Sequence, residues 1–270
     1  MIHIVSGIVV ITAIALACGA LLALAARFLH VPLDTREEAL VKLLPGINCG
    51  ACGFAGCAEF AKALAGGGSK PILCAALSAK KRLALAEFLG MEEEAGHNRR
   101  VAFVACGGNL ADAGRRFVYN GIADCVSAAA TGGGDKACIH GCVGYSTCVR
   151  ACPANAIFLE DGLAVVNPAL CTGCGICVAS CPRRLIHLVP EGPDAHVLCS
   201  SPEKGAAVRK VCGHGCAGCR VCVKLAPGAY VMAGENLASR DYAQPPPENA
   251  AAVVAKCPGK CVRVMGGNAA

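Results

Sequence analysis

The chain opens with one long apolar stretch, and shorter amphipathic and cysteine-rich stretches follow it. Residues 4–26 carry no charged side chain, and these 23 residues exceed the roughly 20 that a helix needs to cross a bilayer. Arg27 follows directly, and no Lys or Arg precedes the stretch. We therefore expect a transmembrane helix at residues 1–30, with the cysteine-rich remainder on the cytoplasmic side of the cell (inner) membrane. The alternative is a cleaved signal peptide, but its basic n-region and short apolar core are missing.

The rest of the pattern predicts short elements of both kinds. Residues 34–44 indicate a short helix or an amphipathic link, and residues 75–95, rich in Ala, Leu, Lys and Glu, indicate a helix. Apolar residues after two Cys-Pro pairs, at 153–166 and 182–190, predict short strands. The proline run at 244–248 predicts a break. We expect an α+β protein with little regular structure.

Composition indicates that such a chain needs cross-links other than a conventional core. Aromatic residues make up 4% of the chain, whereas it contains 22 cysteines and 33 glycines. Disulfides, zinc and iron–sulfur clusters are the three candidates. Repeated Cys-x2-Cys spacings, several of them ending in Cys-Pro, favour metal or cluster binding over a disulfide framework.

The formal net charge of +6 is misleading for a protein of this kind. Four thiolates around an oxidised [4Fe-4S] core carry about −2, so four clusters would bring the total to about −2. No aromatic and basic recognition motif accompanies the basic residues. We therefore expect no nucleic-acid partner.

The first cysteine group, site 1, has the spacing Cys49-x2-Cys52-x4-Cys57-x16-Cys74. Glycines between the first three cysteines allow the backbone to turn tightly around an inorganic cluster. Structural zinc is the alternative, but the group lacks the paired Cys-x2-Cys layout of a zinc ribbon. We expect a [4Fe-4S] module at residues 31–95.

Two further sites follow from a ferredoxin-like run, whose fourth cysteine binds the neighbouring cluster in two-cluster ferredoxins. The run Cys171-x2-Cys174-x2-Cys177-x3-Cys181-Pro182 follows a companion that ends in Cys152-Pro153. Cross-ligation assigns the following residues to site 3: Cys171, Cys174, Cys177 and Cys152. It assigns three residues to site 2: Cys142, Cys148 and Cys181. The usual spacing for its fourth ligand reaches Tyr145, so Cys138 is the nearest substitute. This pair defines a ferredoxin-like domain at residues 138–198.

A second ferredoxin-like unit, at residues 199–270, has lost one of its two sites. Site 4 keeps all four of its cysteines: Cys216, Cys219, Cys222 and Cys257. The four positions of its companion are Ala226, Pro247, Ala250 and Val253. Because cross-ligation places these four positions at one cluster, we predict one cluster here.

The remaining cysteines leave two interpretations open. Cys125-x12-Cys138-x3-Cys142 and Cys199-x12-Cys212-x3-Cys216 share one spacing, as a duplicated unit would. A further cluster, site 5, is therefore a candidate, with these ligands: Cys106, Cys125, Cys199 and Cys212. The duplication also conflicts with placing Cys138 in site 2, because its counterpart is Cys212. Buried free thiols are the alternative, and we assign no ligand role to Cys18 or Cys261. The cofactor prediction is at least four [4Fe-4S] clusters, with candidates for five or more.

The order of motifs resembles a known family. An apolar N-terminal helix precedes LPGINCGACGFAGC and then CTGCGICVASCPRRLIHLVP. The chain resembles, over nearly its whole length, the B subunit of the Rnf complex, an ion-translocating ferredoxin:NAD oxidoreductase. Its insert at residues 96–137, which contains VAFVACGG and YNGIADC, is similar to the longer form found in anaerobes. The longer members usually carry two complete ferredoxin pairs, from which this chain departs at the four positions without cysteine.

The resemblance implies a role and its partners. The chain would relay single electrons from reduced ferredoxin towards other subunits of a membrane complex that moves sodium ions or protons. We see no nucleotide-binding loop, so nicotinamide and flavin chemistry belong on partner subunits. The pair Arg183-Arg184 lies beside a proposed cluster and is the best candidate for a ferredoxin-docking face; an ordinary solvated surface is its alternative. Two other functions remain open: a relay subunit of a different membrane oxidoreductase, and a structural zinc-thiolate protein.

Overall fold

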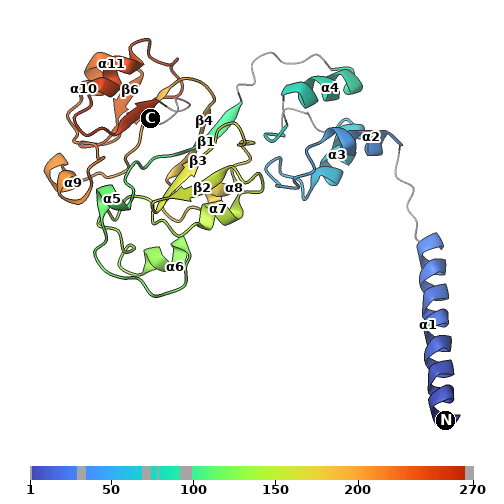
Figure 1. The fold of residues 1–270 in the computed structure, drawn as a ribbon. Coiled ribbons are helices and arrows are strands. Elements are labelled where there is room, and N and C mark those ends of the chain that lie inside the picture. Colours follow the sequence, from blue (N-terminus) through green and yellow to red (C-terminus); the bar gives the residue numbers. More distant parts are fainter. Residues whose placement is uncertain (1, 29–34, 69–73, 78, 92–98, 265–270) are drawn as a thin grey trace.

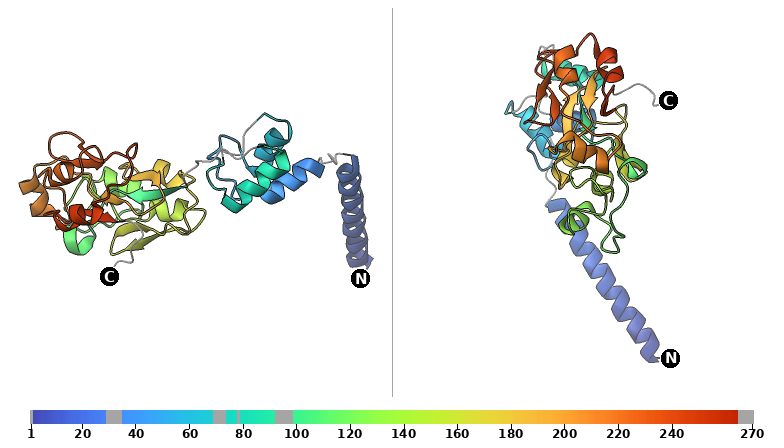
Figure 2. Two further views of the ribbon diagram at one scale, coloured as in Figure 1. Left: turned by 90° about the horizontal axis from the view of Figure 1, so that it is seen from above. Right: turned by 90° about the vertical axis from the view of Figure 1, so that its left-hand side faces the viewer.

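The structure, a computed structural model, describes residues 2–28, 35–68, 74–77, 79–91 and 99–264. It begins with helix α1, Ile2–Phe28, which stands apart from the rest of the fold in both figures (Figures 1 and 2). The predicted helix is therefore present. Within the described residues, however, no helix combines the length and the apolar character that a membrane crossing requires. The predicted transmembrane span is therefore not confirmed.

Three short helices form a small N-terminal module: α2 (Thr35–Leu43), α3 (Cys57–Ala65) and α4 (Ala79–Leu89). Residues of all three helices pack around a common core that includes the buried Leu40, Phe60 and Leu85. Cys74 belongs to the same core. The two helices predicted at 34–44 and 75–95 are confirmed, and they hold the cysteine-bearing loop between them.

The central part of the molecule is built on two antiparallel strand pairs. Strand β1 (Arg100–Val104) pairs with β4 (Ile186–Pro190), and β2 (Ile157–Glu160) pairs with β3 (Leu163–Val166). Four short helices accompany them: α5 (Leu110–Ala113), α6 (Cys125–Ala130), α7 (Thr147–Ala151) and α8 (Ile176–Ser180). The strands predicted after both Cys-Pro pairs are confirmed. The β1–β4 pairing also joins the segments 96–137 and 138–198, which the sequence pattern separates.

The C-terminal lobe is likewise built on two antiparallel strand pairs. Strand β5 (Ala195–Val197) pairs with β8 (Val262–Val264), and β6 (Tyr230–Met232) pairs with β7 (Ala238–Arg240). Three helices complete it: α9 (Gly205–Val211), α10 (Val221–Leu225) and α11 (Ala250–Ala255). Seen from above, the C-terminal lobe, the central part and the N-terminal module lie one after another (Figure 2).

A buried ion pair organises the C-terminal lobe. The Arg240 Nε lies 3.1 Å from an oxygen of Asp194, and the two side chains are 1% and 9% exposed. The same guanidinium donates hydrogen bonds to the carbonyls of Ala229, Gln244 and Pro245. It therefore ties the predicted break at 244–248 to the strands.

Three of the four positions without cysteine in the C-terminal lobe pack into its apolar core. Ala226 and Val253 are buried in the core of the C-terminal lobe, and Ala250 packs against the same core. That this unit holds a single cluster stays a prediction.

Candidate metal centres

Site 1 gathers its thiols between a loop and the start of α3. Cys57 is the first residue of that helix, and its backbone N–H donates to the Asn48 Oδ1 at 2.8 Å, which fastens the loop. Burial, and then the charges of the neighbouring thiols of site 1, raise the pKa of the Cys74 thiol to about 11. The structure thus brings Cys74 to the three cysteines that lie at least sixteen residues before it.

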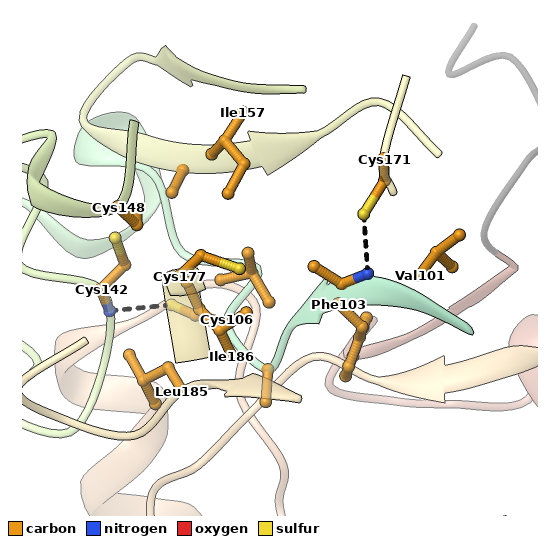
Figure 3. Close-up of a cluster of buried hydrophobic side chains, with 14 of the residues drawn as sticks. Val101, Phe103, Cys106, Cys142, Cys148, Ile157, Cys171, Cys177, Leu185 and Ile186 are labelled. Atoms are coloured by element: carbon orange, nitrogen blue, oxygen red, sulfur yellow. Dashed lines mark hydrogen bonds between the residues drawn. The ribbon is translucent and has the colours of Figure 1, made fainter. Parts of the chain in front are cut away.

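Site 3 lies where α7 and α8 meet the strands. Burial, and then the charges of Cys174, Cys171 and Cys152, raise the pKa of the Cys177 thiol to about 12. The Ala102 N–H of β1 donates to the Cys171 Sγ at 3.3 Å, as Figure 3 shows. The four thiols that the spacing assigns to site 3 are therefore neighbours, although Cys152 comes from the companion motif.

Site 2 draws its thiols from four separate segments. These are the start of α6, the loop before α7, α7 itself and the C-terminal end of α8, and the thiols line a pocket of about 350 Å³: Cys125, Cys142, Cys148 and Cys181. Burial, and then the charges of the other three thiols, raise the pKa of the Cys148 thiol to about 12. Cys125, and not Cys138, completes the group.

Cys138 belongs to a different pocket, and this corrects the sequence-based assignment. A pocket of about 360 Å³ is lined by four thiols, which we keep as site 5: Cys106, Cys138, Cys199 and Cys212. The prediction that placed Cys138 in site 2 and Cys125 in site 5 is thus reversed by the geometry. The physical reason is that Cys125 begins α6, which packs beside Cys142 and Cys148. The duplicated spacing, which matches Cys138 with Cys212, pointed to this alternative.

Two glycines allow the backbone to approach the thiols of site 5 closely. A Cβ atom on Gly108 would lie 2.8 Å from the Cys212 Sγ, and one on Gly141 would lie 3.1 Å from the Cys106 Sγ. A larger residue at Gly108 would force the Cys212 side chain or the backbone to shift, and one at Gly141 would crowd the Cys106 side chain. Both glycines therefore fit a site that holds a group between its thiols.

Site 4 contains one thiol more than its spacing predicts. Its four cysteines line a pocket of about 350 Å³, and Cys261 lines the same pocket. The Cys257 and Cys261 sulfur atoms are 3.7 Å apart. The Cys261 thiol hydrogen-bonds to Cys216 and Cys257, which lowers the pKa of both and raises the pKa of Cys261 itself. Cys261 is thus buried beside the site, as the free-thiol interpretation expects, but in direct contact with it.

Two family models match parts of the chain that contain these sites. The model described as "Putative Fe-S cluster" matches residues 44–75, which hold site 1. The model described as "4Fe-4S binding domain" matches residues 164–187, which hold the run of site 3. Among the described residues, no group of three or more His, Cys, Asp or Glu side chains is arranged to hold a single metal ion.

Several curated proteins are similar to this chain over most of its length. The B subunit of the "Ion-translocating oxidoreductase complex" of Methanosarcina acetivorans is 35% identical over 96% of this chain and 98% of its own length. The B subunit of the "Na(+)-translocating ferredoxin:NAD(+) oxidoreductase complex" of Acetobacterium woodii is 36% identical over 89% of this chain and 72% of its own. The B subunit of the "Proton-translocating ferredoxin:NAD(+) oxidoreductase complex" of Clostridium ljungdahlii is 36% identical, with 96% and 91% covered. The chain belongs to the family of Rnf B subunits.

The thiol pockets fit the chemistry of this family. As a member of the Rnf B-subunit family, the chain is an iron–sulfur electron-transfer subunit of an oxidoreductase complex. Sites 2, 4 and 5 each have four or more thiols that line one pocket. Thiolates are the ligands that [4Fe-4S] clusters take from proteins. The thiols that line these pockets are therefore the kind of ligand that membership of the family implies.

The two arginines of the proposed docking pair of this Rnf-family chain differ in their exposure. Arg183 is half-buried, and its guanidinium donates hydrogen bonds to the carbonyls of Gly133 and Gly141. Arg184 is exposed in a left-handed turn. The Arg183 guanidinium is turned towards the thiols, so Arg184 is the member of the pair with an exposed charge, and the docking face stays a prediction.

One charged residue at these sites was not expected from the sequence pattern. Lys136 is buried at 2% exposure and lines the pocket of site 5. It stands beside a glycine-rich turn, where a lysine is usually exposed. Only the assembled fold of this Rnf-family chain shows that it faces the thiols.

Proposed function

We propose that this chain relays single electrons from reduced ferredoxin, through five [4Fe-4S] clusters, towards partner subunits of an ion-translocating ferredoxin:NAD oxidoreductase. One observation carries the proposal: twenty of the 22 cysteines fall into five groups of four neighbouring thiols. Only Cys18 and Cys261 stand outside these groups. The names of the Acetobacterium and Clostridium relatives support ferredoxin and NAD as the redox partners.

Each cluster, when bound, supplies a centre that gains or loses one electron without making a bond to a substrate. The chain contributes burial and hydrogen bonds to the ligand sulfur atoms. Backbone N–H groups lie 3.3 Å from the sulfur atoms of Cys171, Cys106 and Cys152. Such donors stabilise the added negative charge and therefore raise the reduction potential.

Neighbouring sites lie close to one another, which supports a relay. A Cβ atom on Gly173, between two ligands of site 3, would lie 4.0 Å from the carbonyl oxygen of Ala75, which follows Cys74 of site 1. The Cys142 N–H of site 2 donates to the Cys106 sulfur of site 5, as Figure 3 shows. Cys199 of site 5 hydrogen-bonds to the backbone of Cys216, a ligand of site 4.

Sites 2 and 3 share the two helices α7 and α8, each of which carries one cysteine of one site and ends at a cysteine of the other. The order that these contacts support is site 1, site 3, site 2, site 5 and site 4. Electrons would enter or leave at the N-terminal module and at the C-terminal lobe.

Helix α1 would attach the protein to the lipid bilayer. Large apolar side chains on it are more than half exposed: Val10, Ile11, Ile14, Leu16, Leu21, Leu22, Leu24 and Phe28. Lipid contact would remove this apolar surface from water, which is favourable. The attachment also agrees with the relatives' names, which describe ion-translocating complexes.

The protein purified anaerobically from the membrane fraction is expected to contain about 20 iron atoms and as many sulfide ions per chain, four for each of five clusters. Adding reduced ferredoxin should reduce these centres, as measured by EPR spectroscopy and loss of visible absorbance. A colourless protein that contains zinc would favour the structural zinc-thiolate function. A full iron content with no reduction by ferredoxin would favour a relay in another oxidoreductase.

Cysteine substitutions are expected to reveal which thiols share a site. Cys125→Ala and Cys148→Ala should each lose up to about four iron atoms, and the double variant should lose no more than about four, because one cluster is affected. Cys125→Ala with Cys138→Ala should lose about eight, because two clusters are affected. Iron and sulfide analysis measures both losses.

Cys261→Ala is the matched control for these variants and should keep its iron. Equal losses in the two double variants would contradict the assignment of Cys125 and Cys138 to different sites. Loss of iron in the control would make Cys261 a ligand of site 4.

A further inference from the structure

Two cations lie between site 2 and site 5 without an acidic partner. The Lys136 ammonium group donates hydrogen bonds to the carbonyls of Gly108 at 3.1 Å and Gly162 at 2.7 Å. Among the described residues, the Arg183 guanidinium donates hydrogen bonds to the carbonyls of Gly133 and Gly141. In the part of the chain that the structure describes, no ion pair joins either side chain to a carboxylate. Asp135, the acidic residue next to Lys136, pairs with Arg115 and Tyr145 instead.

Both charges act on the thiols of two sites. Arg183 lines the pocket of site 2. Its charge interacts with Cys142 and Cys181 of site 2 and with Cys138 and Cys106 of site 5. Lys136 lines the pocket of site 5, and its charge acts on Cys106 and Cys212 there and on Cys142 of site 2. The two cations therefore stand at the junction between the sites.

A buried cation that meets only carbonyl dipoles is costly, and proteins place a counter-charge beside it. Four thiolates around an oxidised [4Fe-4S] core carry about −2, so two adjacent clusters would bring about −4 to this junction. The two cations offset part of that charge. Because potential depends on the net charge around a cluster, fixed positive charges favour the reduced form.

We propose that Lys136 and Arg183 raise the reduction potentials of the clusters in sites 2 and 5 and so set the potential in the middle of the relay. This inference rests on the proposed function, because it requires clusters in both sites. When an electron arrives, the two cations offset part of the added negative charge, and when it leaves, the junction returns to the charge of the oxidised clusters. No bond is formed or broken and no proton moves. Lys136 and Arg183 thus act on the clusters through their charge and do not bind them.

The test is a redox titration of the full iron-loaded protein, followed by EPR spectroscopy. In Lys136→Gln and Arg183→Gln, two of the five potentials should shift to more negative values while the other three stay unchanged. Arg183→Lys keeps the charge and should leave all five close to the original values. Arg184→Gln removes the exposed neighbouring charge and is the matched control, with no expected shift.

Two results would overturn the inference. One is unchanged potentials in both glutamine variants with their iron complete. The other is an equal shift in Arg184→Gln, because an exposed charge would then act as strongly as Lys136 or Arg183. If a glutamine variant loses iron, retention of iron and potentials in Arg183→Lys would still support a charge effect, whereas equal loss would contradict it. The iron content of the unsubstituted protein tests the proposed function separately, before any variant is made.

Discussion

Removing the iron from the purified protein is expected to unfold most of residues 99–264. The sheets of this region have only two strands each, and isolated two-stranded pairs are marginally stable in water. Its central core counts five cysteines among its sixteen buried residues: Cys106, Cys142, Cys148, Cys171 and Cys177. If clusters fill the pockets between them, binding free energy and folding free energy are the same quantity.

The loss of structure should appear in far-UV circular dichroism and as rapid proteolysis in the central part and the C-terminal lobe. Mock-treated protein with its iron intact is the control. Full resistance of the iron-free protein to protease would contradict the expectation, and it would mean that the side-chain cores suffice.

Replacing Arg240 with Met is expected to destabilise the C-terminal lobe by about 3–5 kcal/mol, because it leaves the Asp194 carboxylate buried without its partner. The variant also frees the carbonyls of Ala229, Gln244 and Pro245. Hydrogen exchange of the β5 and β7 amides in the iron-loaded protein measures this loss.

Arg263→Gln is the matched control, since Arg263 is an exposed arginine of the same lobe. Exposed charges of this kind contribute about 0–1 kcal/mol. Removing both buried charges, with Asp194→Asn and Arg240→Gln, should recover part of the stability. A change below about 1 kcal/mol in Arg240→Met would show that water or neighbouring groups already compensate the carboxylate.

Local spacing predicted the short-range part of each site well. The structure brings together the four thiols assigned to site 1, to site 3 and to site 4, because most of each set lies within one loop and the following helix. Whether these thiols bind clusters stays a prediction. The strands after the Cys-Pro pairs also followed from local apolar residues.

The rest depends on contacts between distant segments. Strand β1 pairs with β4 more than eighty residues later, and Cys106, just after β1, accepts a hydrogen bond from the Cys142 N–H. Cys125 and Cys138 exchange places relative to the prediction because only tertiary packing decides which pocket each thiol faces. Arg183 was expected to dock ferredoxin, but the turn at 131–134 and the loop at Gly141 draw its guanidinium inward. Helix α1 was predicted correctly as a helix, whereas its span is not confirmed.

The apolar residues that replace cysteines in the C-terminal lobe affect how much iron the cell must supply. Ala226 and Val253 pack there, and the Arg240 network holds the proline-containing loop. Shape in that half of the lobe is therefore maintained by ordinary side chains. Under the proposed function, a chain built in this way would require about four fewer iron atoms than one with both sites complete, and it would expose one fewer centre to damage by oxygen.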